Sequence, residues 1–183
     1  MTTTRREQIL DTAATLFAER GFHGVSVHDI GSACGISGPA LYKHFTGKDD
    51  VLTQSLIAIS ERLLEEGRSR SEMAADAEDA LGALIDWHIE FALGHRALIV
   101  IQEREWANLG TDGRRDVRAL QLAYNDIWVD TVQHLRDDLD AAEARAAVQA
   151  TFGLINSTPH SARISESSMA SRLARMARAA LLA

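Results

Sequence analysis

The chain has 183 residues, of which 46% are hydrophobic and 25% are charged, and its formal net charge is −7. With 29 Ala, 12 Gly and 2 Pro, its composition excludes collagen-like and low-complexity proteins and favours helices over a turn-rich β fold. Cys34 is the single cysteine, so the chain can form neither an internal disulfide nor a cysteine-based zinc site.

Apolar runs in this sequence are short. No purely apolar run is longer than residues 97–101, whereas a membrane span requires about 20 such residues. The first residues also contain no apolar signal region. We therefore expect a cytoplasmic protein without membrane contacts, in which Cys34 stays reduced and is a small buried residue rather than a redox sensor.

Charge is distributed unevenly. Residues 1–46 carry four basic and four acidic groups, so the net charge of −7 belongs to residues 47–183. The net negative charge of the whole chain therefore does not argue against nucleic-acid binding by residues 1–46, which are neutral overall.

Two helix starts are marked by capping boxes. At residues 4–7 a Thr hydroxyl and a Glu carboxylate can satisfy free amides, which predicts a helix that ends at Gly21. A second cap at residues 26–29 predicts a helix that ends before Gly35.

A third, very short helix is predicted after Ser37, ending near residue 45. Pro39 is tolerated in its first turn, where no backbone N–H is needed. Three short helices, the last two joined by a tight turn at Gly35, are typical of a helix-turn-helix. Small three-helix packings also occur in many enzymes, so the pattern alone leaves the function open.

The residues themselves narrow the choice. Residues 25–52, VSVHDIGSACGISGPALYKHFTGKDDVL, closely resemble the tetracycline-repressor (TetR) family of transcriptional regulators, and ILDTAATLFAERGF at 9–22 is similar to the first helix of that family. The tightest motif is Leu41-Tyr-x-His-Phe45 followed by Lys48. Beyond residue 60, only the helical architecture and the length are similar.

This resemblance implies an all-α fold with two parts. A three-helix helix-turn-helix head, residues 1–47, would bind DNA, and a helical bundle, residues 48–183, would bind a ligand and dimerise. Helices are predicted from the pattern of apolar residues at 77–94, 97–109, 113–138, 140–157 and 166–182, after a fourth helix that starts at 46–49 and stops in the polar stretch 71–76.

The DNA-binding residues are expected around the second and third helices. The hydroxyl and amides at Ser26 can receive a phosphate, and the small residues at 38–40 allow close approach to a major groove. Lys43 can donate to guanine, and Ala40 can contact a thymine methyl group. The resemblance implies that Tyr42, His44 and Lys48 touch DNA. The full predicted set is Ser26, His28, Ser37, Gly38, Pro39, Ala40, Tyr42, Lys43, His44 and Lys48.

Three of these residues have plainer alternatives. Tyr42 could pack between helices, His44 could cap a helix end, and Lys48 could be a solvated charge.

Polar residues interrupt the apolar faces of the later helices, as in small-molecule pockets. The predicted effector-binding set is His88, Phe91, Gln102, Trp106, Gln121, Tyr124, Asn125 and Trp128. A packed core with satisfied polar residues is the alternative. We expect no cofactor and no metal, because the sequence lacks a Cys/His cluster. The acidic charge of residues 47–183 disfavours a small polyanion, so a lipid-like or acyl-CoA effector fits better than a sugar phosphate.

No catalytic motif is present, so an enzyme is not expected. Ala146, Ala150, Gly153 and Ser157 form a small-residue stripe, and the last helix has a Met/Leu face. The resemblance implies that these two helices, about 140–157 and 166–182, form a homodimer interface. The resulting hypothesis is a ligand-responsive repressor that binds a palindromic operator as a homodimer and is released by a small, mostly apolar effector. The alternatives are a DNA-binding regulator without an effector and a helical enzyme or scaffold.

Overall fold

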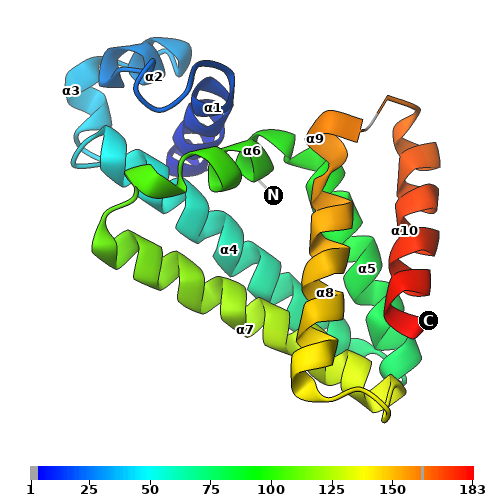
Figure 1. Cartoon of the computed structure of the whole chain (residues 1–183). Helices are drawn as coiled ribbons and strands as arrows, with labels where there is room; N and C mark the ends of the chain where they lie inside the picture. Colours follow the sequence, from blue (N-terminus) through cyan, green and yellow to red (C-terminus); the bar gives the residue numbers. More distant parts are fainter. Residues whose placement is uncertain (1–3, 162) are drawn as a thin grey trace. The chain divides into compact units, whose positions relative to one another are not determined.

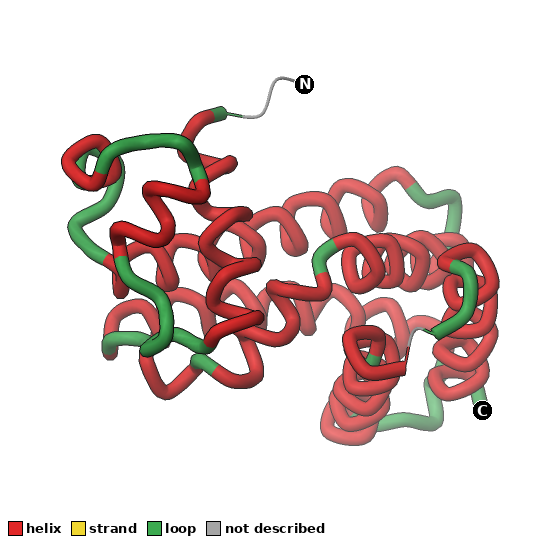
Figure 2. The backbone as a smooth tube through the Cα atoms, turned by 90° about the horizontal axis from the view of Figure 1, so that it is seen from above, coloured by secondary structure: helices red, strands yellow, loops and turns green. Residues whose placement is uncertain are grey.

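The computed structural model describes residues 4–161 and 163–183, and all the regular structure in these ranges is helical (Figure 1, Figure 2). The predicted all-α class is therefore confirmed. The chain divides into two compact units. The first contains the residues up to Ile59 together with Ala97–Arg118, and the second contains Ser60–Arg96 and Ala119–Ala183. Among the described helices, none combines the length and the apolar character that a membrane span requires.

Helix α1 (Arg5–Arg20) begins and ends at the predicted signals. The Thr4 hydroxyl accepts a hydrogen bond from the Glu7 N–H, and the Glu7 carboxylate accepts one from the Thr4 N–H. Gly21 follows with φ 71°, a left-handed backbone that an L side chain rarely adopts, and its N–H bonds to the Phe17 carbonyl.

Helices α2 (Val27–Ala33) and α3 (Gly38–Leu41) form the helix-turn-helix, with Gly35 at φ 65° between them. A second capping box links Ser26 and Asp29, and the hydrogen bonds from Ser26 lower the pKa of the Asp29 carboxyl. Helix α3 is shorter than predicted. Beyond Leu41 the backbone continues as turns, with the His44 N–H bonded three residues back.

The core of the first unit lies between these helices. Its fully buried side chains include Ile9, Phe17, Ile30, Leu41 and Leu52. The predicted burial of Cys34 was wrong: its side chain is half-exposed at the end of α2, where its carbonyl accepts a hydrogen bond from Arg5.

Helices α4 (Lys48–Met73) and α7 (Thr111–Leu135) each contribute residues to both units. Helix α4 ends at Met73, inside the polar stretch 71–76 where the sequence predicted its stop. The predicted helix at 97–109 is wrong in part, because α6 (Arg96–Arg104) ends early and a 3₁₀ turn, η1 (Trp106–Asn108), follows.

The second unit also contains α5 (Ala77–Gly94), α8 (Ala141–Asn156), α9 (Thr158–Ser161) and α10 (Glu166–Leu182). Helix α10 packs against α5 and α8, and α5 packs against α8 and α9. Helix α9 lies between the predicted helices at 140–157 and 166–182, where no helix was expected. The buried Thr158 hydroxyl donates to the Ala92 carbonyl at 2.9 Å, which fixes this turn against α5.

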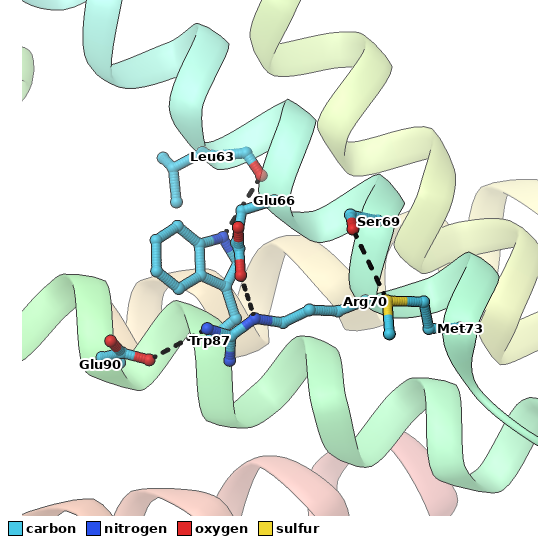
Figure 3. A network of polar contacts seen from close by, with 7 residues as sticks. All are labelled: Leu63, Glu66, Ser69, Arg70, Met73, Trp87 and Glu90. Atoms are coloured by element: carbon cyan, nitrogen blue, oxygen red, sulfur yellow. Dashed lines mark hydrogen bonds and ion pairs between the residues drawn. The ribbon is translucent and has the colours of Figure 1, made fainter. Parts of the chain in front are cut away.

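An ion-pair network joins α4 and α5 (Figure 3). The Arg70 guanidinium contacts Glu66 at 2.7 Å and Glu90 at 3.3 Å, and its carbon lies 4.8 Å from the centre of the Trp87 ring. The Trp87 indole N–H donates to the Leu63 carbonyl at 3.3 Å. These contacts fix α4 against α5 beside the buried part of the second unit.

Candidate DNA-binding and effector sites

The helix-turn-helix presents polar side chains to solvent immediately after α3. Tyr42 is 58% exposed, and Lys43 and His44 are also exposed. The exposed aromatic ring, followed directly by Lys43 and His44, is available for contact with a partner and is not needed for the core. The alternative in which Tyr42 packs between helices is therefore not what the structure shows.

The other predicted DNA-binding residues surround this segment. His28, Ser37 and Pro39 are exposed, Ala40 is half-buried, and Gly38 begins α3. The Ser26 hydroxyl is already bonded to Asp29 as a helix cap. Since the hydroxyl serves the cap, a phosphate contact at Ser26 would depend on backbone N–H groups at the start of α2.

Lys48 is half-buried at the start of α4, and its amine has two contacts within the first unit. It donates to the Phe22 carbonyl at 2.9 Å and lies 4.2 Å from the centre of the Phe22 ring. Lys48 therefore holds the end of α1, whatever else it contacts.

A buried cluster of aromatic and polar side chains lies between α5, α7 and α8 in the second unit. The His88 ring stacks on Phe152 with 4.6 Å between ring centres, and the Trp128 ring stands edge-on to Phe152 at 5.0 Å. The Tyr124 ring stacks on both His88 and Phe152, with 5.7 Å between ring centres in each pair. His88, Tyr124 and Trp128 are each less than 5% exposed.

Hydrogen bonds order this cluster. His88 Nε2 lies 3.1 Å from Asn156 Oδ1, an acceptor, and His88 Nδ1 lies 3.2 Å from the Tyr124 hydroxyl. Burial lowers the pKa of His88 to about 4, so the imidazole is neutral at pH 7. A neutral ring that donates from Nε2 must accept at Nδ1, so Tyr124 donates to His88. Burial also raises the pKa of the Tyr124 phenol, which keeps this donor protonated.

Two family models match this chain. The model described as bacterial regulatory proteins, tetR family, matches residues 9–54, and that of the tetracyclin repressor-like C-terminal domain matches residues 74–181. The chain belongs to the TetR family. It is therefore a DNA-binding transcriptional regulator of a non-enzymatic family, and the predictions of family, fold and regulatory class are confirmed.

Curated TetR-family relatives match over most of the chain. The HTH-type transcriptional repressor KstR2 of Mycolicibacterium smegmatis is 31% identical over 144 residues, covering 74% of this chain and 70% of the relative. The fatty acid metabolism regulator protein of Bacillus subtilis is 24% identical over 157 residues, covering 82% of this chain and 79% of the relative.

Solved TetR-family structures match the whole fold. A regulator from Bordetella parapertussis has a TM-score of 0.83 at 26% identity, covering 96% of this chain and 95% of that chain. AibR in complex with isovaleryl coenzyme A and operator DNA has a TM-score of 0.77 at 22% identity, covering 94% and 97%. FadR of Bacillus subtilis in complex with stearoyl-CoA has a TM-score of 0.74 at 18% identity, covering 93% and 96%. The last two likenesses show the fold alone.

The structure of this TetR-family chain brings some predicted effector residues together and leaves others apart. His88, Phe91, Tyr124 and Trp128 are in contact in the second unit. Asn125, on the same helix, accepts a hydrogen bond from Arg145 at 3.0 Å. Gln102 and Trp106, both half-buried, belong to the first unit. Over the described residues, no group of three or more His, Cys, Asp or Glu side chains is placed to hold a metal ion.

Sequence reasoning missed two residues with clear structural roles. Asn156 holds the buried His88, and its position four residues after Phe152 on one helix could have indicated this. Glu105 is buried (8% exposed) and accepts a hydrogen bond from the Phe22 N–H at 3.1 Å. No local sequence signal could have revealed that contact, because the two residues are 83 positions apart.

The small-residue stripe of α8 faces outward. Ala146, Ala150 and Gly153 are exposed, while Val148 and Ile155 on the other face are buried. Ser157, the last residue of the predicted stripe, caps the end of α8 and is half-buried. A Cβ added at Gly153 would have no neighbour within 4 Å. On α10, which packs against α8, Met176 is 46% exposed and Leu173 is buried.

Proposed function

We propose that this protein is a homodimeric repressor that binds a palindromic operator and leaves it when an acyl-CoA or a similar lipid-like effector binds. The observation that carries the effector part is the buried His88–Tyr124–Trp128–Phe152 cluster. A neutral imidazole, a phenol, an amide and an indole within an aromatic wall offer a few directed polar groups to an otherwise apolar molecule.

In this proposal, residues 1–47 are the DNA-binding head, and Tyr42, Lys43 and His44 approach the duplex first. Their exposure next to a helix-turn-helix supports this placement. The remaining contacts are proposed for His28, Ser37 and the start of α3, with Lys48 and the amides near Ser26 on the phosphate backbone.

Residues 48–183 carry the effector and dimer functions in this proposal. The outward stripe of α8 and the exposed Met176 of α10 support a two-fold interface, because small residues allow close helix approach and Met supplies apolar area. A two-fold dimer would match a palindromic operator. Similar chains that bind isovaleryl coenzyme A or stearoyl-CoA support the effector class.

The test starts with the operator. The purified protein selects binding sites from random DNA, and fluorescence anisotropy on the selected site then measures release by isovaleryl-CoA and stearoyl-CoA. The proposal predicts a palindromic site, a dimer in sedimentation, and loss of DNA binding with at least one of the two compounds but not with free coenzyme A. Operator binding that neither compound changes would instead support a regulator without such an effector.

A further inference from the structure

Two consecutive arginines, Arg5 and Arg6, are exposed in the first turn of α1 and bond to other parts of the first unit. The Arg5 guanidinium donates through one terminal nitrogen to the Cys34 carbonyl at 2.7 Å and through the other to the Gln8 side chain at 3.1 Å. Exposed arginines in a DNA-binding head usually bind phosphate oxygens. Here both terminal nitrogens of Arg5 are bonded to acceptors of the protein itself.

The Cys34 carbonyl marks the point where the chain leaves α2. Cys34 caps this helix, and its carbonyl belongs to the peptide group that leads into the left-handed Gly35, at φ 65°. Carbonyls at a helix C-terminus lack intrahelical partners and carry partial negative charge, so a guanidinium beside them is favourable. Because Arg5 holds this peptide group to α1, it fixes the direction in which the backbone turns towards α3.

Arg6 acts at the other end of the turn and the short helix. The exposed residues 42–44 lie between two core anchors, Leu41 at 0% exposed and Phe45 at 2%. The Arg6 guanidinium carbon lies 5.3 Å from the centre of the Phe45 ring, and Arg6 Nη2 donates to Gln54 Oε1 at 2.6 Å. Since Gln54 belongs to α4, Arg6 ties the second anchor to both α1 and α4.

We propose that Arg5 and Arg6 are positioning residues for operator recognition, which hold residues 35–44 at both ends instead of binding phosphates. Operator affinity scales with the fraction of molecules whose recognition residues are in the binding orientation, so a looser segment lowers that affinity. Non-specific DNA binding depends on the positive charge rather than on this orientation. The inference rests on the proposed function, in which residues 42–44 face the duplex.

Substitution of each arginine by lysine separates position from charge. Lysine keeps the positive charge, but its single compact ammonium cannot reproduce the two-nitrogen contact of Arg5 or the contact of the planar Arg6 group with the Phe45 ring. Fluorescence anisotropy measures the affinity of the wild type, Arg5→Lys, Arg6→Lys and the double variant for two duplexes. One is the operator selected from random DNA, and the other is a scrambled duplex of the same length.

The double variant should bind the operator roughly tenfold more weakly than the wild type, since two contacts each worth about one hydrogen bond are lost. On the scrambled duplex its affinity should stay within about twofold of the wild type, with an unchanged slope of log affinity against log salt concentration. The specificity ratio, defined as operator affinity divided by scrambled affinity, should therefore fall.

Gln54 provides a test that changes no charge. Gln54→Met removes the acceptor of Arg6, so it should lower the specificity ratio as Arg6→Lys does. Because both substitutions break the same contact, the variant that combines them should show little further loss. Arg20→Lys is the matched control, because this exposed arginine lies at the opposite end of α1 and should leave the ratio unchanged. Thermal unfolding establishes the temperature below which every variant is folded, and binding is measured there.

Three results would overturn the inference. Unchanged affinities in the double variant would mean that the arginines act through charge alone. Equal losses on both duplexes would identify them as phosphate contacts. A lower melting temperature with an unchanged specificity ratio would mean that their contacts only stabilise the fold.

Lys43→Ala tests the proposed function separately. Unchanged operator affinity in that variant would remove Lys43 from the duplex, whatever the arginine variants show. A normal loss in Lys43→Ala, with an unchanged specificity ratio in the double arginine variant, would leave the proposed function standing and overturn the inference alone.

Discussion

The Glu105 carboxylate accepts a hydrogen bond from the Phe22 N–H at 3.1 Å, while the Lys48 amine donates to the carbonyl of the same Phe22 at 2.9 Å. Two charged side chains from distant parts of the chain thus hold both polar groups of one residue, directly after the left-handed Gly21 that ends α1. Glu105 also accepts from the Asn108 side chain at 2.7 Å, so the carboxylate ties the segment after α6 to the end of α1.

Removal of this carboxylate should weaken the first unit. In Glu105→Ala the Phe22 N–H loses its acceptor in a buried position, so the free energy of unfolding should fall by about 1–3 kcal/mol. Glu105→Gln keeps an acceptor oxygen and should lose less. Chemical denaturation measures both, with the exposed Glu103→Ala on α6 as the control. If Glu105→Ala were as stable as Glu103→Ala, the contact would contribute nothing.

Lys43 and Lys48 should respond differently to alanine substitution. Lys43 is exposed, so Lys43→Ala should lower operator affinity without changing stability. It should also reduce the slope of log affinity against log salt concentration by about the value of one phosphate contact. Lys48→Ala also breaks the contact with Phe22, so it should lower the melting temperature as well as the affinity. Anisotropy at several salt concentrations, together with thermal unfolding, separates the two effects. Equal melting temperatures for the two variants would contradict the structural role of Lys48.

Protonation of His88 should make stability depend on pH. Its pKa is about 4 in the folded protein and 6.5 as the reference for the unfolded chain, so the unfolded state takes up the proton first. The stability from a neutral His88 is complete above pH 6.5 and is lost as the pH falls towards 4. Between pH 7.5 and 4.5 the wild type should lose roughly 2 kcal/mol more unfolding free energy than His88→Gln.

The exposed His160 provides the control for that measurement. His160→Gln should keep the full pH dependence of the wild type. A His88→Gln profile parallel to the wild type would show that His88 does not remain neutral in the fold.

Gly67 allows α4 to approach Tyr124 closely. A Cβ at Gly67 would lie 2.5 Å from Tyr124 Cε2, a distance that forces the ring to move. Since His88 holds the phenol, Gly67→Ala should cost about 1–3 kcal/mol and disturb effector binding. Gly82→Ala on α5 is the control, because its nearest neighbour would be the end of the Arg178 side chain at 3.9 Å. A Gly67→Ala variant with unchanged stability would mean that the Tyr124 ring has room to move.

The proposed dimer interface can be tested at Gly153. This glycine is exposed within a helix and has open space, so Gly153→Arg should leave the subunit folded. In the proposed interface the same side chain would separate the partners, giving monomers with weak operator affinity. Sedimentation velocity measures the mass, and Gly94→Arg, at another exposed helical glycine with open space, is the control. A Gly153→Arg variant that stays dimeric would place the interface elsewhere.

Local signals in the sequence determined the helical class, the capping boxes at Thr4 and Ser26, and the turns at Gly21 and Gly35. These features depend on residues within four positions of one another, so a single sequence contains them. The Leu41–Phe45 motif likewise indicated the family that the comparisons then showed.

Tertiary structure alone decided which residues meet. Periodicity predicted apolar faces containing His88, Trp106 and Trp128, but it could not tell which element covers each face. The fold places Trp106 in the first unit, pairs His88 with Asn156 across 68 positions, and turns the small-residue stripe of α8 outward. Such contacts depend on how whole helices pack against each other, so the sequence around one residue does not identify its distant partner.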